Sequence, residues 1–122
     1  MIRHKTKGQI EAEISKAVVE FEQEYMGRGP KEVVTILLRD MVFIRLKGVL
    51  TPAEKQLAKS HEGKMLVKQI RVRLLEDAKK ILERIIVDIT GARVVSMHTD
   101  ISTITGERVI IFTMSGNLES GK

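Results

Sequence analysis

The sequence predicts an α+β fold of two layers, in which helices pack on one face of a four-stranded, mainly antiparallel sheet. Two pairs of segments rich in β-branched residues, at about 33–46 and 93–114, indicate two hairpins. Segments with helical spacing precede the first pair and separate the two pairs, which gives the order α-β-β-α-α-β-β. Because hairpins separated by helices can share one sheet, this order favours a single domain over residues 1–122. We expect its core at about 8–114 and a flexible tail at 115–122.

The first helix is predicted by apolar residues that recur three and four positions apart. Thr6 and Gln9 have the spacing of a capping box in front of it, and Gly27 is a suitable helix stop. The opposite face is expected to be acidic, because residues 10–25 hold five Glu and one Lys. The predicted core face consists of Ile10, Ile14, Ala17, Val18, Phe21 and Tyr25.

The first hairpin is predicted at Val33–Leu38 and Met41–Leu46, with only Arg39-Asp40 between the strands. This connection lacks the glycine that favours a two-residue turn, so a longer loop is equally allowed and the register stays open. The second pair of strands is predicted at Arg93–Thr99 and Glu107–Met114.

Two helices are predicted between the hairpins. Thr51, Pro52 and Glu54 form a strong start signal, because Thr and Glu can cap each other and proline suits the first helical position. We expect Gly63 to interrupt this helix and a longer helix to run over about 64–90. The apolar stripe of the longer helix is wider than one contact with a sheet requires. The surplus predicts a second contact, either with the first helix or with a second subunit. We therefore expect a homodimer, formed through the long helix or through the open sheet face.

The composition limits the classes of function. The chain has no cysteine, which excludes disulfides, thiolate metal sites and thiol nucleophiles and fits the cytoplasm. No apolar stretch approaches the ~20 residues that span a bilayer. We expect a soluble cytoplasmic protein, with a peripheral contact to a membrane as an alternative. The net charge of +5 favours anionic partners.

A basic run makes nucleic-acid binding the first alternative function. Residues 64–84 hold seven Lys and Arg against three acidic residues. These side chains are scattered around the predicted helix, and no aromatic residue lies among them to stack on a base. A solvated helix face is therefore the better explanation of the run. Its basic members are Lys64, Lys68, Arg71, Arg73, Lys79, Lys80 and Arg84.

The main candidate for a binding site is the corner Gly27, Arg28 and Gly29, which would hold an anion or a partner. Glycines allow a close approach to the backbone amides, and a guanidinium offers a planar fork of donors to phosphate or carboxylate. The corner lacks the lysine of a P-loop and leads into a strand instead of a helix. A purely structural corner is the competing interpretation.

His98 and Asp100 are weaker candidates. Residues two apart on a strand point to the same side, so these two could form an acid/base pair. An Asp that begins a loop more often caps its own backbone. His4, His61 and His98 have no metal-ligand spacing, and we expect no metal, no cofactor and no catalytic residue.

Three groups of motifs resemble a bacterial family when they are taken in order. They are Tyr25-Met26-Gly27-Arg28-Gly29-Pro30, then Lys47-Gly48-Val49-Leu50-Thr51-Pro52-Ala53-Glu54, then Thr90-Gly91-Ala92-Arg93-Val94 with Asp100 and Gly106-Glu107-Arg108-Val109-Ile110-Ile111-Phe112. Together they resemble the MpsC-like family, first catalogued as a domain of unknown function and named after a Na+-translocating membrane-potential-generating system. The resemblance covers about residues 8–114 and carries over no catalytic residue. It implies a soluble or peripheral accessory protein.

Three classes of function are therefore expected. The resemblance favours a non-enzymatic accessory or regulatory protein of a membrane ion-transport or membrane-potential-generating system, which binds a protein partner or a small anion. A basic nucleic-acid-binding module is the first alternative. An uncharacterised enzyme that uses Arg28, His98 and Asp100 is the second.

Overall fold

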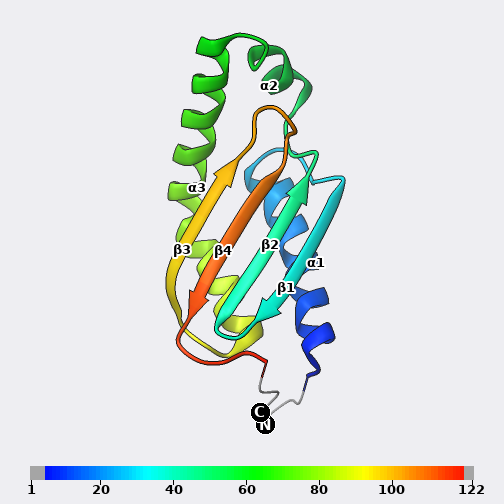
Figure 1. Ribbon diagram of the computed structural model, residues 1–122, viewed down its shortest axis with the longest axis vertical. Helices are drawn as coiled ribbons and strands as arrows, with labels where there is room; N and C mark the ends of the chain where they lie inside the picture. Colours follow the sequence, from blue (N-terminus) through cyan, green and yellow to red (C-terminus); the bar gives the residue numbers. More distant parts are fainter. Residues whose placement is uncertain (1–4, 120–122) are drawn as a thin grey trace.

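The computed structural model describes residues 5–119 and confirms the α+β fold and the order of its elements. Figure 1 shows the long helix α3 and the helix α1 lying behind one sheet. The elements along the chain are α1 (Lys7–Tyr25), β1 (Glu32–Leu38), β2 (Met41–Lys47), α2 (Pro52–Leu57), α3 (His61–Thr90), β3 (Val94–Ile101) and β4 (Arg108–Met114).

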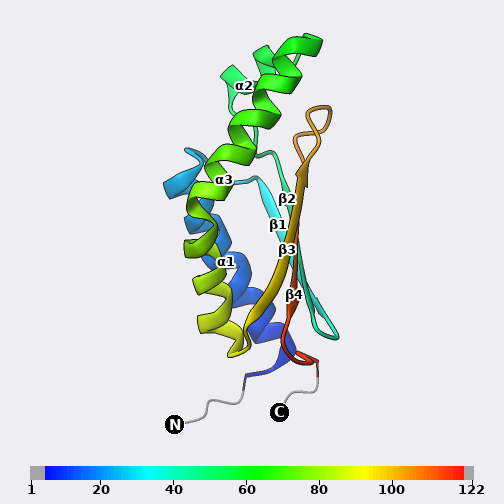
Figure 2. The same cartoon turned by 90° about the vertical axis from the view of Figure 1, so that its left-hand side faces the viewer.

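The sheet has the strand order β1-β2-β4-β3, and each neighbouring pair is antiparallel. The second hairpin therefore joins the first through β4, which pairs with β2, while β1 and β3 form the edges. Figure 2 shows α1 and α3 on one face of the sheet, and the described residues place no element on the other face. The predicted two layers are confirmed, and the strand order, which no local pattern determines, comes from the structure alone.

The first hairpin closes in a two-residue turn, because Leu38 lies opposite Met41. Arg39 adopts the left-handed region at φ 57°, which glycine normally occupies. The segment after β4 supports this turn: the amide of Leu118 donates to the carbonyl of Arg39 at 2.7 Å, and Glu119 Oε2 accepts from the Arg39 amide at 2.6 Å. Contacts far along the chain thus stabilise a turn without glycine. Of the tail expected at 115–122, residues 120–122 lie outside the described part.

The predicted helix ends are confirmed at three places. Thr6 and Gln9 form the capping box of α1, and Thr51 and Glu54 form that of α2. Gly91 ends α3 in the left-handed conformation at φ 76°. Local side-chain chemistry is therefore sufficient to set these boundaries.

The prediction that Gly63 interrupts the helix is wrong. α2 ends at Leu57, and α3 begins at His61 with Ser60 as its N-cap, so Gly63 lies in the first turn of α3. A Cβ on Gly63 would lie 1.6 Å from the Leu57 carbonyl oxygen. Glycine is required because α2 and α3 approach closely, not because the helix breaks there.

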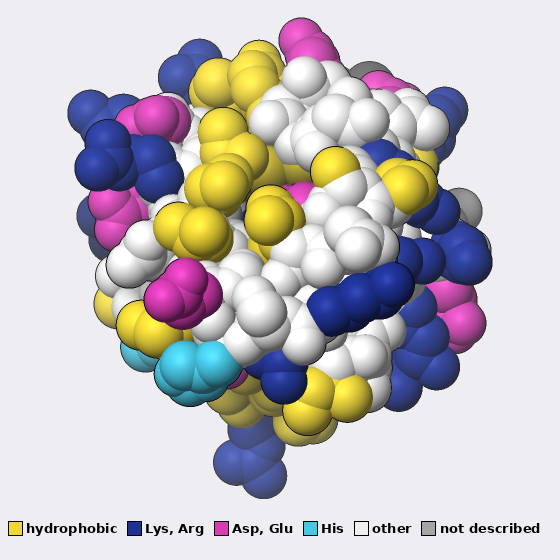
Figure 3. Space-filling model, turned by 90° about the horizontal axis from the view of Figure 1, so that it is seen from above, with side chains coloured by type: hydrophobic (Ala, Val, Ile, Leu, Met, Phe, Trp, Pro, Cys, Tyr) yellow, Lys and Arg dark blue, Asp and Glu magenta, His cyan; other side chains and the backbone are white. Residues whose placement is uncertain are grey.

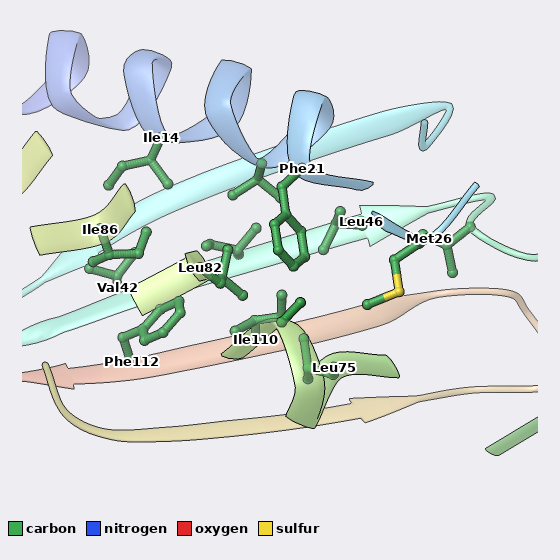
Figure 4. Packing of buried hydrophobic residues seen from close by; sticks show 14 of the residues in the cluster. Ile14, Phe21, Met26, Val42, Leu46, Leu75, Leu82, Ile86, Ile110 and Phe112 are labelled. Atoms are coloured by element: carbon green, nitrogen blue, oxygen red, sulfur yellow. The ribbon is translucent and has the colours of Figure 1, made fainter. Parts of the chain in front are cut away.

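The core lies between the helices and the inner face of the sheet (Figure 4). α1 contributes Ile14 and Phe21, and α3 packs against both α1 and β3. α1 of the same chain thus makes a second contact with α3, while Leu66, Ile70 and Ile81 of α3 stay exposed and a contact with a second subunit stays a prediction. The core residues labelled in the figure are Ile14, Phe21, Met26, Val42, Leu46, Leu75, Leu82, Ile86, Ile110 and Phe112.

Candidate functional site

The glycine corner after α1 is tied to the linker between β2 and α2. Gly27 has φ 83°, which allows the chain to leave the helix. The half-buried Arg28 donates from Nη1 to the carbonyl oxygen of Leu50 at 3.3 Å. The two corners identified in the sequence therefore meet in space. Binding of an anion or a partner by Gly27, Arg28 and Gly29 stays a prediction.

His98 and Asp100 are both exposed on the edge strand β3. They line different pockets, one beside Leu75 and Lys79 and the other beside Lys68, and Arg28 lines neither. Asp100 Oδ1 lies 3.6 Å from Lys68 Nζ, so its nearest described charge is that of a lysine. Arg28 thus shares neither of these pockets with His98 or Asp100, and use of the three residues by an enzyme stays a prediction.

The described residues contain no group of three His, Cys, Asp or Glu side chains arranged to hold a metal ion. His4 lies outside the described residues. Within the described part, no helix combines the length and the apolar character needed to cross a bilayer.

Four charged side chains that the sequence did not bring together form a buried ion cluster, defined as Glu22, Glu54, Arg71 and Arg108. Arg71 makes a bidentate pair with Glu54, with Nε–Oε2 at 2.8 Å and Nη2–Oε1 at 2.6 Å. Arg108 Nη1 donates to Glu22 Oε2 at 3.3 Å. Arg71 Nη1 lies 3.9 Å from Glu22 Oε1, so the four side chains form one connected, charge-balanced group.

The cluster joins four elements, because its members come from α1, α2, α3 and β4. Arg71 Nη2 also donates to the carbonyl of Val49 at 2.7 Å, which fixes the linker after β2. Arg108 Nε lies 3.4 Å from Thr99 Oγ1 on β3. Glu22 is fully buried, and its Oε1 and Arg71 Nη1 have no hydrogen-bond partner among the described residues.

Burial and pairing shift the pKa values of the cluster in opposite directions. Burial raises the pKa of Glu22 above its ordinary 4.5, although the charges of Arg108 and Arg71 oppose the shift. Burial also acts to raise the pKa of Glu54, but hydrogen bonds from Arg71 and Thr51 and the charge of Arg71 outweigh it, so this pKa is lowered. Burial lowers the pKa of Arg108. Glu22, Arg71 and Arg108 are buried and Glu54 is half-buried, which suits a structural clamp better than a site open to substrate.

The spacing of the residues contains the signal that could have revealed the cluster. Glu22 stands four positions after the buried Val18, within the apolar stripe of α1. Arg71 stands midway between the buried Val67 and Leu75 on α3. The expectation that Glu22 lies on a solvated acidic face is wrong, because it is fully buried. A charge at a core position of an amphipathic helix predicts a buried partner of opposite sign.

Burial of Arg71 also removes one charge from the basic run on α3. Lys68 pairs with Asp100, and Arg84 Nε lies 3.8 Å from Asp88 Oδ1. Arg71 is therefore not available to phosphates, while the two exposed pairs are weak, and nucleic-acid binding stays a prediction.

The open face of the sheet is largely apolar. Side chains on β2 and β4 alternate, so those between the buried ones point away from the helices. The strand register brings Ile36, Phe43, Ile111 and His98 into one row across the face. Ile36 is 49% exposed. The apolar members of the open face are Val34, Ile36, Leu38, Met41, Phe43, Val109 and Ile111.

Polar side chains border this apolar surface along β3 and towards the loop between β3 and β4, whereas the β1 edge is apolar. Ser96, His98 and Asp100 form the margin on β3. Arg45, which pairs with Glu107 at an Nε–Oε2 distance of 2.6 Å, forms the margin towards the loop between β3 and β4. An apolar surface with polar side chains along part of its margin resembles the anatomy of a protein interface.

Comparison with known proteins decides the family. The model of the family described as "Na+-translocating membrane potential-generating system (MpsC)" matches residues 6–116, nearly the whole chain. The chain belongs to the MpsC family. The MpsC-like resemblance expected from the glycine corners is thereby confirmed.

Two relatives from Bacillus subtilis (strain 168) match over most of their length. "Uncharacterized protein YbcI" is 49% identical over 115 residues, which cover 94% of this chain and 93% of the relative. "Uncharacterized protein YrhF" is 24% identical over 111 residues, which cover 90% of this chain and 91% of the relative. No solved structure matches the chain. The family description suggests association with a membrane-potential-generating system, and the relatives add no activity.

Proposed function

We propose that the protein is a non-enzymatic accessory of a membrane-potential-generating system and that it acts by binding a protein partner through the open face of its sheet. The observation that carries this proposal is the apolar open face, which the described elements leave uncovered. The description of the MpsC family supports the choice of a membrane system. We propose a cytoplasmic location for the complex.

The physical argument for binding is the apolar area that water contacts on this face. Ile36, Leu38 and Val34 on β1 are 49%, 44% and 40% exposed, which is high for three β-branched or aliphatic residues on one strand. Burying these three side chains against a partner would stabilise the complex by roughly 25 cal/mol per Å² of apolar surface removed from water. A contiguous apolar patch on a monomer of this size is typical of a binding surface.

The extent of the face favours one segment of a larger partner over a second copy of the chain. The strands have seven or eight residues each, so with a spacing of about 4.8 Å and a rise of about 3.3 Å the sheet spans about 19 by 23 Å. This flat extent, about 440 Å², is the footprint of one or two chain segments, because a helix with its side chains is about 10 Å wide. We therefore propose an apolar segment of a membrane-protein subunit as the occupant, held at the apolar surface and at its polar margin.

Binding to membrane vesicles from the native host tests this proposal. The purified chain should bind saturably, and prior protease treatment of the vesicles should abolish binding, because the partner is a protein. Ile36→Lys should weaken binding by about 10- to 100-fold, the equivalent of about 1.5–3 kcal/mol for one lost apolar side chain. Ile70→Lys on α3 is the matched control, because Ile70 is 47% exposed and lies away from the sheet face.

The expected homodimer, through the long helix or through the open sheet face, is the competing hypothesis, and in the second case a second copy would occupy the same face. Sedimentation equilibrium of the purified chain separates the two cases. A stable dimer that Ile36→Lys dissociates would assign the face to a second copy and overturn the proposal of a membrane partner. Equal vesicle binding by the Ile36→Lys and Ile70→Lys variants would show that the sheet face is not the binding surface.

A further inference from the structure

A pocket at the end of the molecule beyond the sheet is lined by four lysines from separate elements. Lys31 precedes β1, Lys55 and Lys59 come from α2 and the turn after it, and Lys64 belongs to the first turns of α3. The pocket has a volume of about 640 Å³. No acidic side chain is among its lining residues.

The lysines of this pocket are not neutralised within the described part of the chain. Some lysines elsewhere have acidic partners, as Lys5 has Glu13 and Lys68 has Asp100, whereas what distinguishes the pocket is that four unpaired lysines line one hollow. The side-chain ammonium groups of the four pocket lysines make no hydrogen bond or ion pair with a described residue. Four unpaired ammonium groups around one hollow repel one another, so an anion placed among them would be stabilised by all four.

The backbone around the pocket is held by specific contacts. The amide of Val49 donates to the carbonyl of Gly106 at 3.2 Å, which joins the corner after β2 to the loop between β3 and β4. Gly48 has φ 69°, and a Cβ there would lie 2.8 Å from Lys31 Cγ. The aliphatic stem of Lys31 therefore packs over Gly48, which directs this lysine along the pocket wall. The hydroxyl-bearing residues Thr103 and Thr105 complete the wall.

The lining also contains apolar surface, from Leu50, Ala58 and Ile104. Ile104 is 85% exposed at the tip of the loop between β3 and β4. Figure 3, which looks down on this end of the molecule, shows Lys and Arg side chains with hydrophobic side chains exposed among them. Pocket volumes of about 300–1,000 Å³ are typical of small-molecule sites.

The geometry points to this pocket as a binding site for a multiply charged phosphate group, such as a pyrophosphate or a phosphate monoester. Lysines bind phosphate as point charges and require no planar acceptor, whereas a single carboxylate would use only part of the positive charge. No aromatic side chain lines the pocket to stack on a base, so the charged group is what the site recognises. The inference goes beyond the proposed function, because it concerns a different surface and a different ligand.

Two sources of the phosphate group are possible, a free phosphorylated small molecule and the headgroup of an anionic lipid. Isothermal titration with inorganic pyrophosphate at low ionic strength tests the first. Sedimentation with phosphatidylcholine vesicles that contain phosphatidic acid tests the second. Ile104→Ser distinguishes them, because loss of the exposed isoleucine should weaken vesicle binding and leave pyrophosphate binding unchanged.

The decisive variant is the double substitution Lys55→Ala and Lys59→Ala. With about fivefold lost per lysine near an anionic surface, binding should weaken by about 25-fold. The matched control is Lys16→Ala with Lys80→Ala, which removes the same charge from two exposed lysines that do not line the pocket. The control should bind as the wild type does, and thermal unfolding should confirm that both double variants are folded.

Two results would overturn the inference. One is the absence of saturable binding to both pyrophosphate and the anionic vesicles. The other is an equal loss in the two double variants, which would mean that only net charge matters. The Ile36→Lys variant should bind pyrophosphate as the wild type does, so the outcome for the pocket is independent of the outcome for the sheet face.

Discussion

Replacing Arg71 by methionine should destabilise the fold strongly, because it removes the central member of the buried ion cluster. Arg71 donates two hydrogen bonds to Glu54, at 2.8 and 2.6 Å, and one to the Val49 carbonyl at 2.7 Å. Methionine keeps much of the aliphatic stem and none of these donors. Among the described residues Glu22 would then keep Arg108 as its one ion-pair partner, and the Val49 carbonyl would lose the hydrogen bond from Arg71.

The magnitude follows from these contacts. A hydrogen bond to a charged group contributes about 1.5–3 kcal/mol, and removing one partner from a buried pair costs about 3–5 kcal/mol. Arg71 is only 2% exposed, so water cannot replace the lost donors. We expect the free energy of unfolding to fall by about 3–5 kcal/mol.

Urea unfolding followed by circular dichroism measures this loss. The matched control is Arg73→Met, because Arg73 is exposed on the same helix, and its effect should stay within about 0.5 kcal/mol. A loss below about 1 kcal/mol for Arg71→Met would refute the reasoning, since it would mean that desolvation of the cluster cancels its pairing.

Three further predictions follow. The pKa of Glu22 is higher in the folded protein than the ordinary 4.5, so above pH 4.5 the folded state binds more protons than the unfolded state. The free energy of unfolding therefore falls as the pH rises through the folded pKa. Urea unfolding at a series of pH values should show that Glu22→Gln flattens this fall. Glu54 has the opposite sign: its stabilisation is present above pH 4.5 and is lost as the pH falls through its lowered pKa, so Glu54→Gln should remove part of the acid-induced loss, and an unchanged acid slope would contradict this. Gly63→Ala should lower the free energy of unfolding by about 3 kcal/mol, because the added Cβ would lie 1.6 Å from the Leu57 carbonyl oxygen. In the control, Gly8→Ala, the added Cβ meets nothing within 4 Å, and the free energy of unfolding should rise by about 0.5 kcal/mol. Equal melting temperatures for the two variants would refute the packing argument.

Local sequence signals were sufficient for most of the fold. The capping boxes at Thr6 and Thr51 and the stop at Gly91 depend on neighbouring residues only, and the structure confirms them. The order β1-β2-β4-β3 depends on contacts between distant segments, so no local pattern could give it. The turn at Arg39 has the same cause, since Leu118 and Glu119 hold it from the far end of the chain.

The buried charges were missed for a different reason. Periodicity assigns residues to a face by their polarity, so it placed Glu22 and Arg71 on solvated faces. Their positions within the apolar stripes were the better guide, because position determines burial and burial then requires a partner. The lysine pocket was missed because its lining residues are far apart in the sequence. They meet only in the folded chain, where α2 lies beside the loop between β3 and β4.

Photo-cross-linking in living cells tests most directly whether the open sheet face binds a membrane-protein subunit. A photoreactive residue is placed at Ile36 in one variant and at Ile70 in another, two positions of nearly equal exposure, 49% and 47%. We expect Ile36 to give a product that contains an integral membrane protein and stays in the membrane after carbonate extraction, and Ile70 to give none. A product from Ile36 with twice the mass of the chain, or the same membrane product from both positions, would contradict the proposal.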